Sequence, residues 1–433
     1  MSVSATPLRI LVVQPLYGGS LTVGRYAVAA LRELGHVVEV FEGPSFNGSF
    51  NALKSLRIGS DRLGALESSF LQIVSQAVLA QAEAFEPDLV LAPAQAPLSR
   101  QALTRLRRDG VLTAMWFVED FELFTYWKGF APLYDVFAVI QKEPFLSQLS
   151  AIGVQNALYL PLAGLASFHR PLALDSVERR KFGADISFLG AGYPNRRVAF
   201  RQLLRYDFKI WGSDWEGDPL LATRLQRAGE RIEPEEAIKV FAASKINLNL
   251  HSSVRVDPPV GQGDFVNPRT FELACCGAFQ LVDRRSLLDE CFAEDELATF
   301  TDMESLLAAI DHYLTHPEER IAMADKARRR AMAEHTYTAR MQTLLAFIDE
   351  RFPGRLAGSR DAQLEAWSQA LPESMRGDVL ALLERLQLSK DASFKDLVWR
   401  LRQQQGALSS VETAILFLDE WQKQYGMSEQ AKS

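Results

Sequence analysis

A carboxylate and an arginine stand in a short helix that is otherwise suited to burial, within NPRTFELACCGAFQLVD at residues 267–283. Asn267 is a favoured N-cap, and the helix start offers unpaired backbone N–H groups beside Arg269 and Thr270, which suits a diphosphate. Glu272 lies just over one turn further on, where its carboxylate could accept from two neighbouring ribose hydroxyls. These residues therefore predict a nucleotide-diphosphate site. The alternative places Glu272 on the solvent side of an amphipathic helix.

A second turn of the same kind occurs in SFLGAGYPNRR, which has the form strand, glycine turn, helix. Gly190 and Gly192 allow the backbone to approach a ligand closely. Arg196 and Arg197 stand in the first helical turn, where the helix dipole disfavours cations. A bound phosphate would resolve this conflict, whereas both arginines could also simply project into water.

Two loops in the first half of the chain could supply the reacting groups. In LYGGS, Gly18 and Gly19 would let backbone N–H groups approach a sugar or a phosphate. WFVEDF ends a strand with Glu119 and Asp120, which cannot both point into one cleft because neighbours on a strand alternate. Asp120 is the predicted base, with aromatic neighbours that could raise its pKa. An exposed acid in a rim loop is the alternative.

These residues sit at the ends of apolar runs that alternate with helical patterns. The first half predicts one doubly wound parallel sheet. Its expected strands are Arg9–Gln14, His36–Glu42, Asp88–Pro93, Val111–Asp120, Asp135–Gln141 and Asn156–Ala163.

After a linker the alternation starts again and predicts a second Rossmann-like sheet. Its expected strands are Asp185–Gly190, Phe208–Gly212, Lys245–His251, Phe279–Val282 and Glu296–Phe300. The last part of the chain lacks a strand pattern and predicts a helical appendage. This appendage is expected to pack on itself or on the main body, and the alternative is that it binds a partner. Its expected helices are 362–370, 373–388, 394–404 and 410–425. The predicted domains are 1–170, 171–352 and 353–433, with a ligand in the cleft between the first two.

Composition narrows the class of protein. The chain has 433 residues, 48% of them hydrophobic, and a net charge of −7 without a long basic block, so we expect no nucleic-acid partner. The N-terminus has neither the charged start of a signal peptide nor an apolar run long enough for a transmembrane segment. The three cysteines lack the spacing of a disulfide framework or a zinc site. A cytoplasmic protein is expected.

One stretch resembles the donor-site helix of GT-B glycosyltransferases, which carry a Glu-x7-Glu pattern. The second acid of that pattern falls on Glu272, and Asp264, a shorter acid, takes the place of the first. The longer run from AASKINLNLH to SLLDECF, with THPEERIAMADKARRRAMAEHTYTAR, is similar to the CgeB-like, spore-maturation type of glycosyltransferase. DISFLGAGYPNRR, IWGSDW, WFVEDFELF, YDVFAVIQ and ALYLPLA are similar to that family too, so the resemblance covers roughly residues 9–350.

The resemblance implies sugar transfer from a nucleotide-diphosphate sugar in the interdomain cleft, with no metal and no cofactor beyond that co-substrate. Glu272 would then bind the donor ribose, and Arg196 with the helix start at Asn267 would face the diphosphate. Lys245 and His251 would flank the same pocket. A catalytically inactive nucleotide-sugar-binding scaffold and a GT-B epimerase are the alternatives.

The acceptor stays open among protein, glycan, lipid and small molecule, although the acidic charge and the lack of an anchor argue against a membrane-bound one. The helical tail is a candidate site for a protein partner or self-association.

Overall fold

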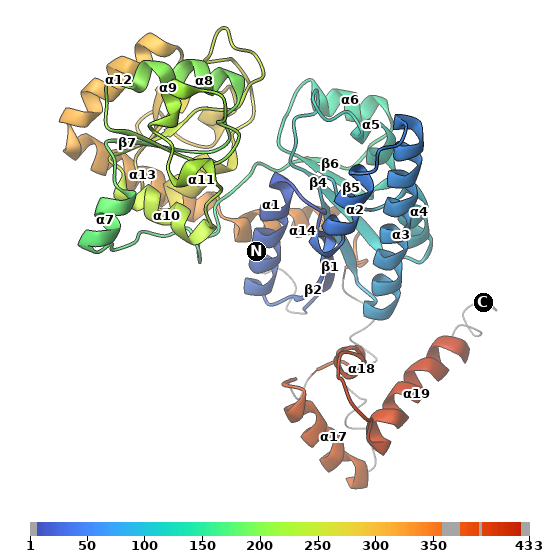
Figure 1. Cartoon of the computed structure of the whole chain (residues 1–433). Coiled ribbons are helices and arrows are strands. Elements are labelled where there is room, and N and C mark those ends of the chain that lie inside the picture. Colours follow the sequence, from blue (N-terminus) through green and yellow to red (C-terminus); the bar gives the residue numbers. More distant parts are fainter. Residues whose placement is uncertain (1–6, 357–372, 389–391, 426–433) are drawn as a thin grey trace.

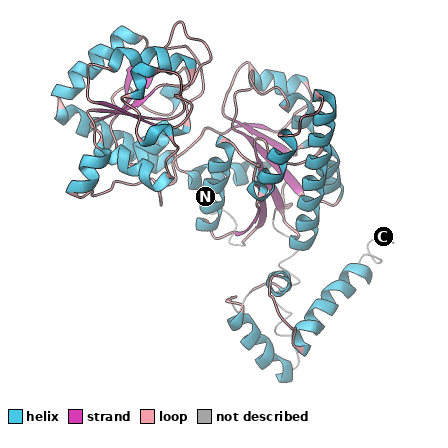
Figure 2. Cartoon of the chain, in the orientation of Figure 1, coloured by secondary structure: helices cyan, strands magenta, loops and turns pink. Residues whose placement is uncertain are grey.

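A computed structural model describes residues 7–356, 373–388 and 392–425. Two parallel sheets, each flanked by helices, form two α/β domains, and a group of helices follows them (Figures 1 and 2). The predicted fold class, two Rossmann-like domains with a helical appendage, is confirmed.

The first sheet has the order β2-β1-β3-β4-β5-β6, with every neighbouring pair parallel. Its central strands are buried on both faces, as expected for apolar runs covered by crossover helices. The strands are β1 (Arg9–Val13), β2 (Val37–Phe41), β3 (Leu89–Pro93), β4 (Leu112–Phe117), β5 (Val136–Val139) and β6 (Ala157–Tyr159). The helices are α1 (Gly19–Glu33), α2 (Asn47–Lys54), α3 (Ser60–Phe85), α4 (Arg100–Arg108), α5 (Trp127–Phe130) and α6 (Phe145–Ala151).

The second sheet has the order β11-β10-β9-β7-β8 and is also parallel. The strands are β7 (Ile186–Leu189), β8 (Phe208–Trp211), β9 (Ile246–Asn249), β10 (Gln280–Asp283) and β11 (Ala298–Phe300). The helices are α7 (Ser176–Phe182), α8 (Pro194–Phe200), α9 (Pro219–Ala222), α10 (Pro234–Ala243), α11 (Pro268–Cys275), α12 (Met303–Thr315) and α13 (Pro317–Glu334).

The next helix, α14 (Tyr337–Arg351), returns to the first domain and packs against α1. Its first residue, Tyr337, is fully buried, with ring centroids 5.3 Å from Tyr26 and 5.8 Å from Trp116. One apolar cluster therefore contains residues of both domains and holds them together. The boundaries at 170 and 352 stay predictions, and α14 lies against the first domain although the sequence grouped it with the second.

Three helices of the tail are described: α17 (Glu373–Arg385), α18 (Phe394–Arg402) and α19 (Ser410–Tyr425). They share a small apolar core of their own. At the start of α19, the Ser409 N–H donates to Glu412 and the Glu412 N–H donates to Ser409 Oγ, which together form a capping box. Trp399 of α18 lies 5.2 Å from Phe85 at the foot of the first domain. The helix predicted at 362–370 lies outside the described residues.

The longest helix, α3, was not predicted from the sequence. By length and composition alone it could cross a membrane, because it has 26 residues and an 18-residue window with a mean hydropathy of 1.3. Core helices of water-soluble proteins pass the same test. The second half of α3 does pack on the first sheet, with Val74, Val78, Ala82 and Phe85 buried.

Candidate functional site

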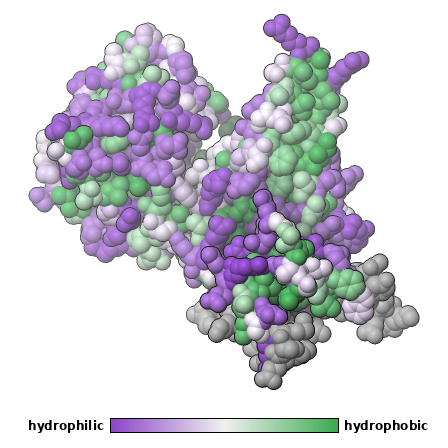
Figure 3. All heavy atoms as spheres, turned by 60° about the horizontal axis from the view of Figure 1, so that its bottom comes forward, coloured by the Kyte–Doolittle hydropathy of each residue, from purple (hydrophilic) through white to green (hydrophobic). Residues whose placement is uncertain are grey.

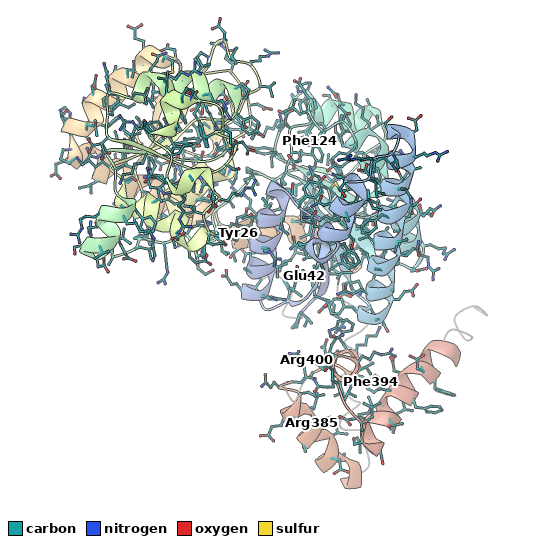
Figure 4. All side chains as sticks on the ribbon, viewed as in Figure 1. Tyr26, Glu42, Phe124, Arg385, Phe394 and Arg400 are labelled. Carbon is teal, nitrogen blue, oxygen red and sulfur yellow. The ribbon has the colours of Figure 1, made fainter. Side chains whose placement is uncertain are left out.

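A cavity of about 290 Å³ lies where α1 of the first domain meets the second domain. Tyr26 of α1 stands at this border (Figure 4). From the second domain, the glycine turn after β7, the start of α10 and the side of α11 that carries Arg269 and Glu272 line the cavity. Residues from these elements include Gly190, Arg231, Ile238, Phe241, Arg269 and Glu272. The cavity joins an apolar wall to two arginines and one carboxylate, a lining that suits a nucleotide.

Glu272 is central to this cavity. Its residue is only 7% exposed although it carries a carboxylate. Nη1 of Arg269 donates to Glu272 Oε2 across 2.6 Å, and the Arg269 guanidinium lies 4.8 Å from the ring centroid of Phe241. The ion pair neutralises the buried charge and engages one carboxylate oxygen. The prediction that Glu272 faces solvent on an amphipathic helix is therefore the weaker of the two alternatives.

A buried polar network fixes the start of α11. The Asn267 side chain accepts from the Thr270 N–H at 3.1 Å and donates to Asn249 Oδ1 at 2.8 Å. The Asn267 N–H donates to Nε2 of His251, so the proton of that imidazole is on Nδ1, which faces Asp283 at 2.7 Å. Burial lowers the pKa of His251, which favours this neutral form.

This network corrects three of the predicted contacts. Thr270 is fully buried and its N–H is capped, and Asn267 points toward Asn249, so neither is a free donor for a diphosphate. Pro268 has no N–H to offer. His251 is 2% exposed and positions the helix start instead of facing the cavity. Arg269 and Glu272 are the residues of α11 that line the cavity.

Arg196 also has a structural role. Its Nε and Nη2 donate to the Leu250 carbonyl, and its Nη1 donates to the Ala191 carbonyl. These bonds join the glycine turn to the end of β9. Burial lowers the pKa of Arg196 to about 10, so the side chain stays protonated at neutral pH. Arg197 likewise donates to backbone carbonyls, including those of Gly192 and Glu216, so it does not project freely into water.

Gly190 lies in the cavity wall as expected. Its carbonyl accepts from the Trp215 indole at 3.0 Å. A side chain at Gly212, whose φ is +119°, would come within 2.4 Å of that carbonyl. The two turns after β7 and β8 can therefore meet only with glycine at position 212.

Lys245 is misplaced in the sequence prediction. It precedes β9, so it lies at the amino end of a parallel strand, whereas the cavity is at the carboxyl ends. Its Nζ pairs with Asp185 at 2.7 Å beside the start of β7, and its side chain is half exposed. Lys245 is therefore left out of the site.

Glu119 and Asp120 face different surroundings, but strand alternation is not the reason, because β4 ends at Phe117 and both acids lie in the bend that follows it instead of in the predicted strand. Glu119 Oε1 accepts from Ser20 Oγ at 2.8 Å and from Gln95 Nε2 at 3.3 Å, and burial raises its pKa. Ser20 lies in the first turn of α1, after the exposed Gly18 and Gly19, and Thr22 of the same helix lines the cavity. Asp120 Oδ1 accepts two N–H groups of the turn that follows it.

A second, larger cavity of about 720 Å³ also lies between the domains. Asp120 and Gln141 line it from the first domain, and Asp264 and Arg284 line it from the second. Gln141 Nε2 donates to Asp264 Oδ1 across 2.9 Å and so joins the two walls. Asp264, which takes the place of the longer acid in the Glu-x7-Glu pattern, thus contacts the first domain.

Several cavity residues were not predicted from the sequence: Thr22, Tyr26, Arg231, Ile238, Phe241, Gln141 and Arg284. Arg284 directly follows β10, so the rule that ligands bind at the carboxyl ends of parallel strands could have found it. Arg231 is separated from β8 by α9 and lies just before α10, so that rule does not identify it. The α1 and α10 residues are apolar or neutral, and their sequence pattern is that of ordinary core helices.

Within the described residues, one group of three side chains could hold a metal ion: His312, His316 and Glu319. All three are exposed where α12 meets α13, with His312 on α12, His316 between the two helices and Glu319 on α13. In Figure 1 α12 lies at the outer edge of the second domain, away from the first domain. His312 Nε2 lies 2.8 Å from Glu319, and the two imidazoles stack at 4.0 Å. This group belongs to neither cavity.

Comparison with known proteins shows to which class of fold this chain belongs. Residues 170–346 match the family model described as "Glycosyl transferase-like". The chain is similar in structure to a sucrose-phosphate synthase of Thermosynechococcus elongatus, at 14% identity and a TM-score of 0.55, over 80% of this chain and 99% of that one. It is also similar to Anabaena HepE in complex with UDP and glucose, at 13% identity and a TM-score of 0.53, over 79% and 100%. The fold is that of GT-B glycosyltransferases.

One known protein is similar to this chain in sequence over more than one domain's length. Spore protein CgeB of Bacillus subtilis is 22% identical over 257 residues, which are 56% of this chain and 77% of that protein. The resemblance to the CgeB-like GT-B glycosyltransferases, stated from the sequence, is therefore confirmed.

Proposed function

We propose that this protein transfers a sugar from a nucleotide-diphosphate donor bound in the cavity around Glu272. The buried Arg269–Glu272 pair at the interdomain border carries the proposal. Glu272 Oε1 is left to accept from the ribose hydroxyls, because Oε2 is engaged by Arg269. Arg231 and Arg269 are the cationic groups in this lining and face the diphosphate. The apolar wall of Ile238 and Phe241 takes the base.

The reacting group is Glu119 in preference to Asp120. Glu119 is held by Ser20 and Gln95 at the start of α1, and burial raises its pKa, which brings it closer to neutral pH as a base requires. Asp120 lines the second cavity with Gln141, Asp264 and Arg284, and this polar cavity takes the acceptor. Gly18 is the N-cap of α1 and Gly19 is its first residue, so their N–H groups are available to the sugar.

No metal takes part in the proposed reaction. Among the described residues that line the donor cavity, Glu272 is the single carboxylate, and it is already paired with an arginine. The two arginines supply the positive charge that a divalent cation supplies in other enzymes of phosphate chemistry. Sugar transfer that persists in EDTA would support this, and an absolute requirement for Mg²⁺ or Mn²⁺ would refute it.

The test of the function uses the full chain with a set of nucleotide sugars and a range of acceptors. Transfer, or slow donor hydrolysis that Glu272→Ala abolishes, is the expected result. Donor binding without any turnover would favour the inactive scaffold. Conversion of the free nucleotide sugar without an acceptor would favour the epimerase.

A further inference from the structure

The hairpin formed by α2 and the first half of α3, residues 47–73, carries exposed apolar side chains on the first domain. They are Leu56, Ile58, Leu66, Leu71 and Ile73, and they are between 36% and 66% exposed. Figure 3 shows a largely hydrophobic surface on this domain, green at the upper right. An exposed apolar group of this kind on a globular domain indicates an interaction surface.

The dimensions of α3 explain why its first half is uncovered. Its 26 residues span about 39 Å at the rise of an α-helix, whereas the five residues of β3 span about 17 Å. The end of α3 leads into the amino end of β3, and its last turns pack on the sheet. The start of α3 therefore extends past the carboxyl edge of the sheet, which is the edge that carries the cleft.

The hairpin is adjacent to a loop of the candidate site. Lys54 at the end of α2 lies 5.2 Å from the ring centroid of Tyr17. Tyr17 belongs to the LYGGS loop, which follows β1 and leads into α1, and it is half exposed. A surface that contacts the hairpin would thus lie beside the opening of the cleft.

The charge of the hairpin tip differs from that of the whole chain. Residues 54–62 are all exposed or half-exposed and contain the bases Lys54, Arg57 and Arg62 with a single acid, Asp61. The chain as a whole carries −7. Aliphatic side chains flanked by lysine and arginine suit the boundary between the headgroups and acyl chains of an anionic bilayer.

We propose that this hairpin docks the protein on an anionic lipid surface, with Ile58, Leu66 and Ile73 entering the headgroup boundary. Two observations favour lipid over a protein partner. The surface is made of leucine and isoleucine, whereas the energetic centres of protein interfaces are rich in tryptophan, tyrosine and arginine. It also projects from the domain, which suits insertion into a soft phase. The helix does not cross the bilayer, because its second half is part of the core.

The test is co-sedimentation of the full chain with vesicles of phosphatidylcholine alone or mixed with phosphatidylglycerol. We compare wild type, the double variant Ile58→Glu/Ile73→Glu, and Ile321→Glu. Ile321 is 64% exposed on α13, which matches the 66% exposure of Ile73 but lies on the second domain. Because the double variant removes two apolar side chains from the surface and adds two negative charges to it, its partitioning to anionic vesicles should fall at least about tenfold. Ile321→Glu should bind like wild type.

Three results would overturn the proposal. Wild type could stay in the supernatant with both kinds of vesicle, or the double variant could sediment as well as wild type. Alternatively, light scattering could find a wild-type dimer that the double variant abolishes, which would make the hairpin an interface between copies of this chain. The proposal does not depend on the donor chemistry, and the double variant should bind nucleotide as wild type does.

Discussion

Arg269 and Glu272 lie one turn apart on α11, and Nη1 of the arginine donates to Oε2 of the glutamate across 2.6 Å. This pair supplies the two kinds of group that the proposed donor site needs, one for a phosphate and one for a ribose. The arginine keeps further N–H groups for an anion, and the glutamate keeps an oxygen for hydroxyls. The pair lines a cavity to which the first domain also contributes Thr22 and Tyr26.

Replacing Glu119 by glutamine should lower the rate of sugar transfer by about 10²–10⁴-fold, as expected for loss of a general base. Because burial raises the pKa of Glu119, folding favours its protonated form over its carboxylate. The stability that this group contributes at low pH is therefore lost as the pH rises through the raised pKa. Glu119→Gln should therefore melt no lower than wild type at pH 7. Activity of wild type should rise with pH through the raised pKa. A larger loss in Asp120→Asn than in Glu119→Gln would contradict this assignment.

His251→Ala should destabilise the second domain by about 1–3 kcal/mol, because it removes a buried imidazole and leaves the partly buried Asn267 N–H without its partner. Donor affinity should fall with it, since Asn267 caps the helix that carries Arg269 and Glu272. Urea unfolding followed by intrinsic fluorescence measures the stability. His312→Ala removes an exposed imidazole of the same domain and serves as the control. Equal stability of the two variants would mean that the network does not hold α11.

Gln141→Ala should separate the roles of the two cavities. It removes the bond to Asp264 from the wall of the larger cavity and leaves the donor cavity untouched. KM for the acceptor should rise several-fold, whereas the dissociation constant of the donor nucleotide should stay as in wild type. A change in donor affinity alone would place the acceptor elsewhere.

The sequence predicted both sheets and the positions of most strands. Apolar runs that alternate with helical patterns are compatible with few architectures other than a parallel sheet covered by helices. It did not predict α3. The first half of that helix is uncovered and the second half is buried, so no single periodic stripe marks it. Residues 44–85 connect two strands that were both predicted from their own apolar runs. Predicting these strands did not require any particular structure in the connection between them.

The site was predicted in part for a similar reason. Glu272 and Arg269 are identifiable because charge in a helix suited to burial needs an explanation. Tyr26 and Phe241 gave no such signal, since an aromatic residue in a core helix is ordinary. Asn267 and His251 were predicted near the ligand because they belong to the right segments, yet only the structure reveals that the His251 imidazole accepts from the Asn267 N–H and that the Asn267 side chain donates to Asn249 inside the domain. Lys245 was placed at the wrong end of a strand.

The central claim is that Glu272 holds a nucleotide donor, and one measurement tests it most directly. Thermal shifts of the full chain are recorded with UDP, GDP, dTDP, CMP and ADP and their sugars for wild type, Glu272→Ala and Glu334→Ala. Glu334 also pairs with an arginine, Arg330, on a helix of the second domain, but outside the cavity. Since ligands that bind the native state raise its melting temperature, one nucleotide family should raise it for wild type and Glu334→Ala and not for Glu272→Ala. Equal shifts for all three proteins, or none for any, would contradict the account.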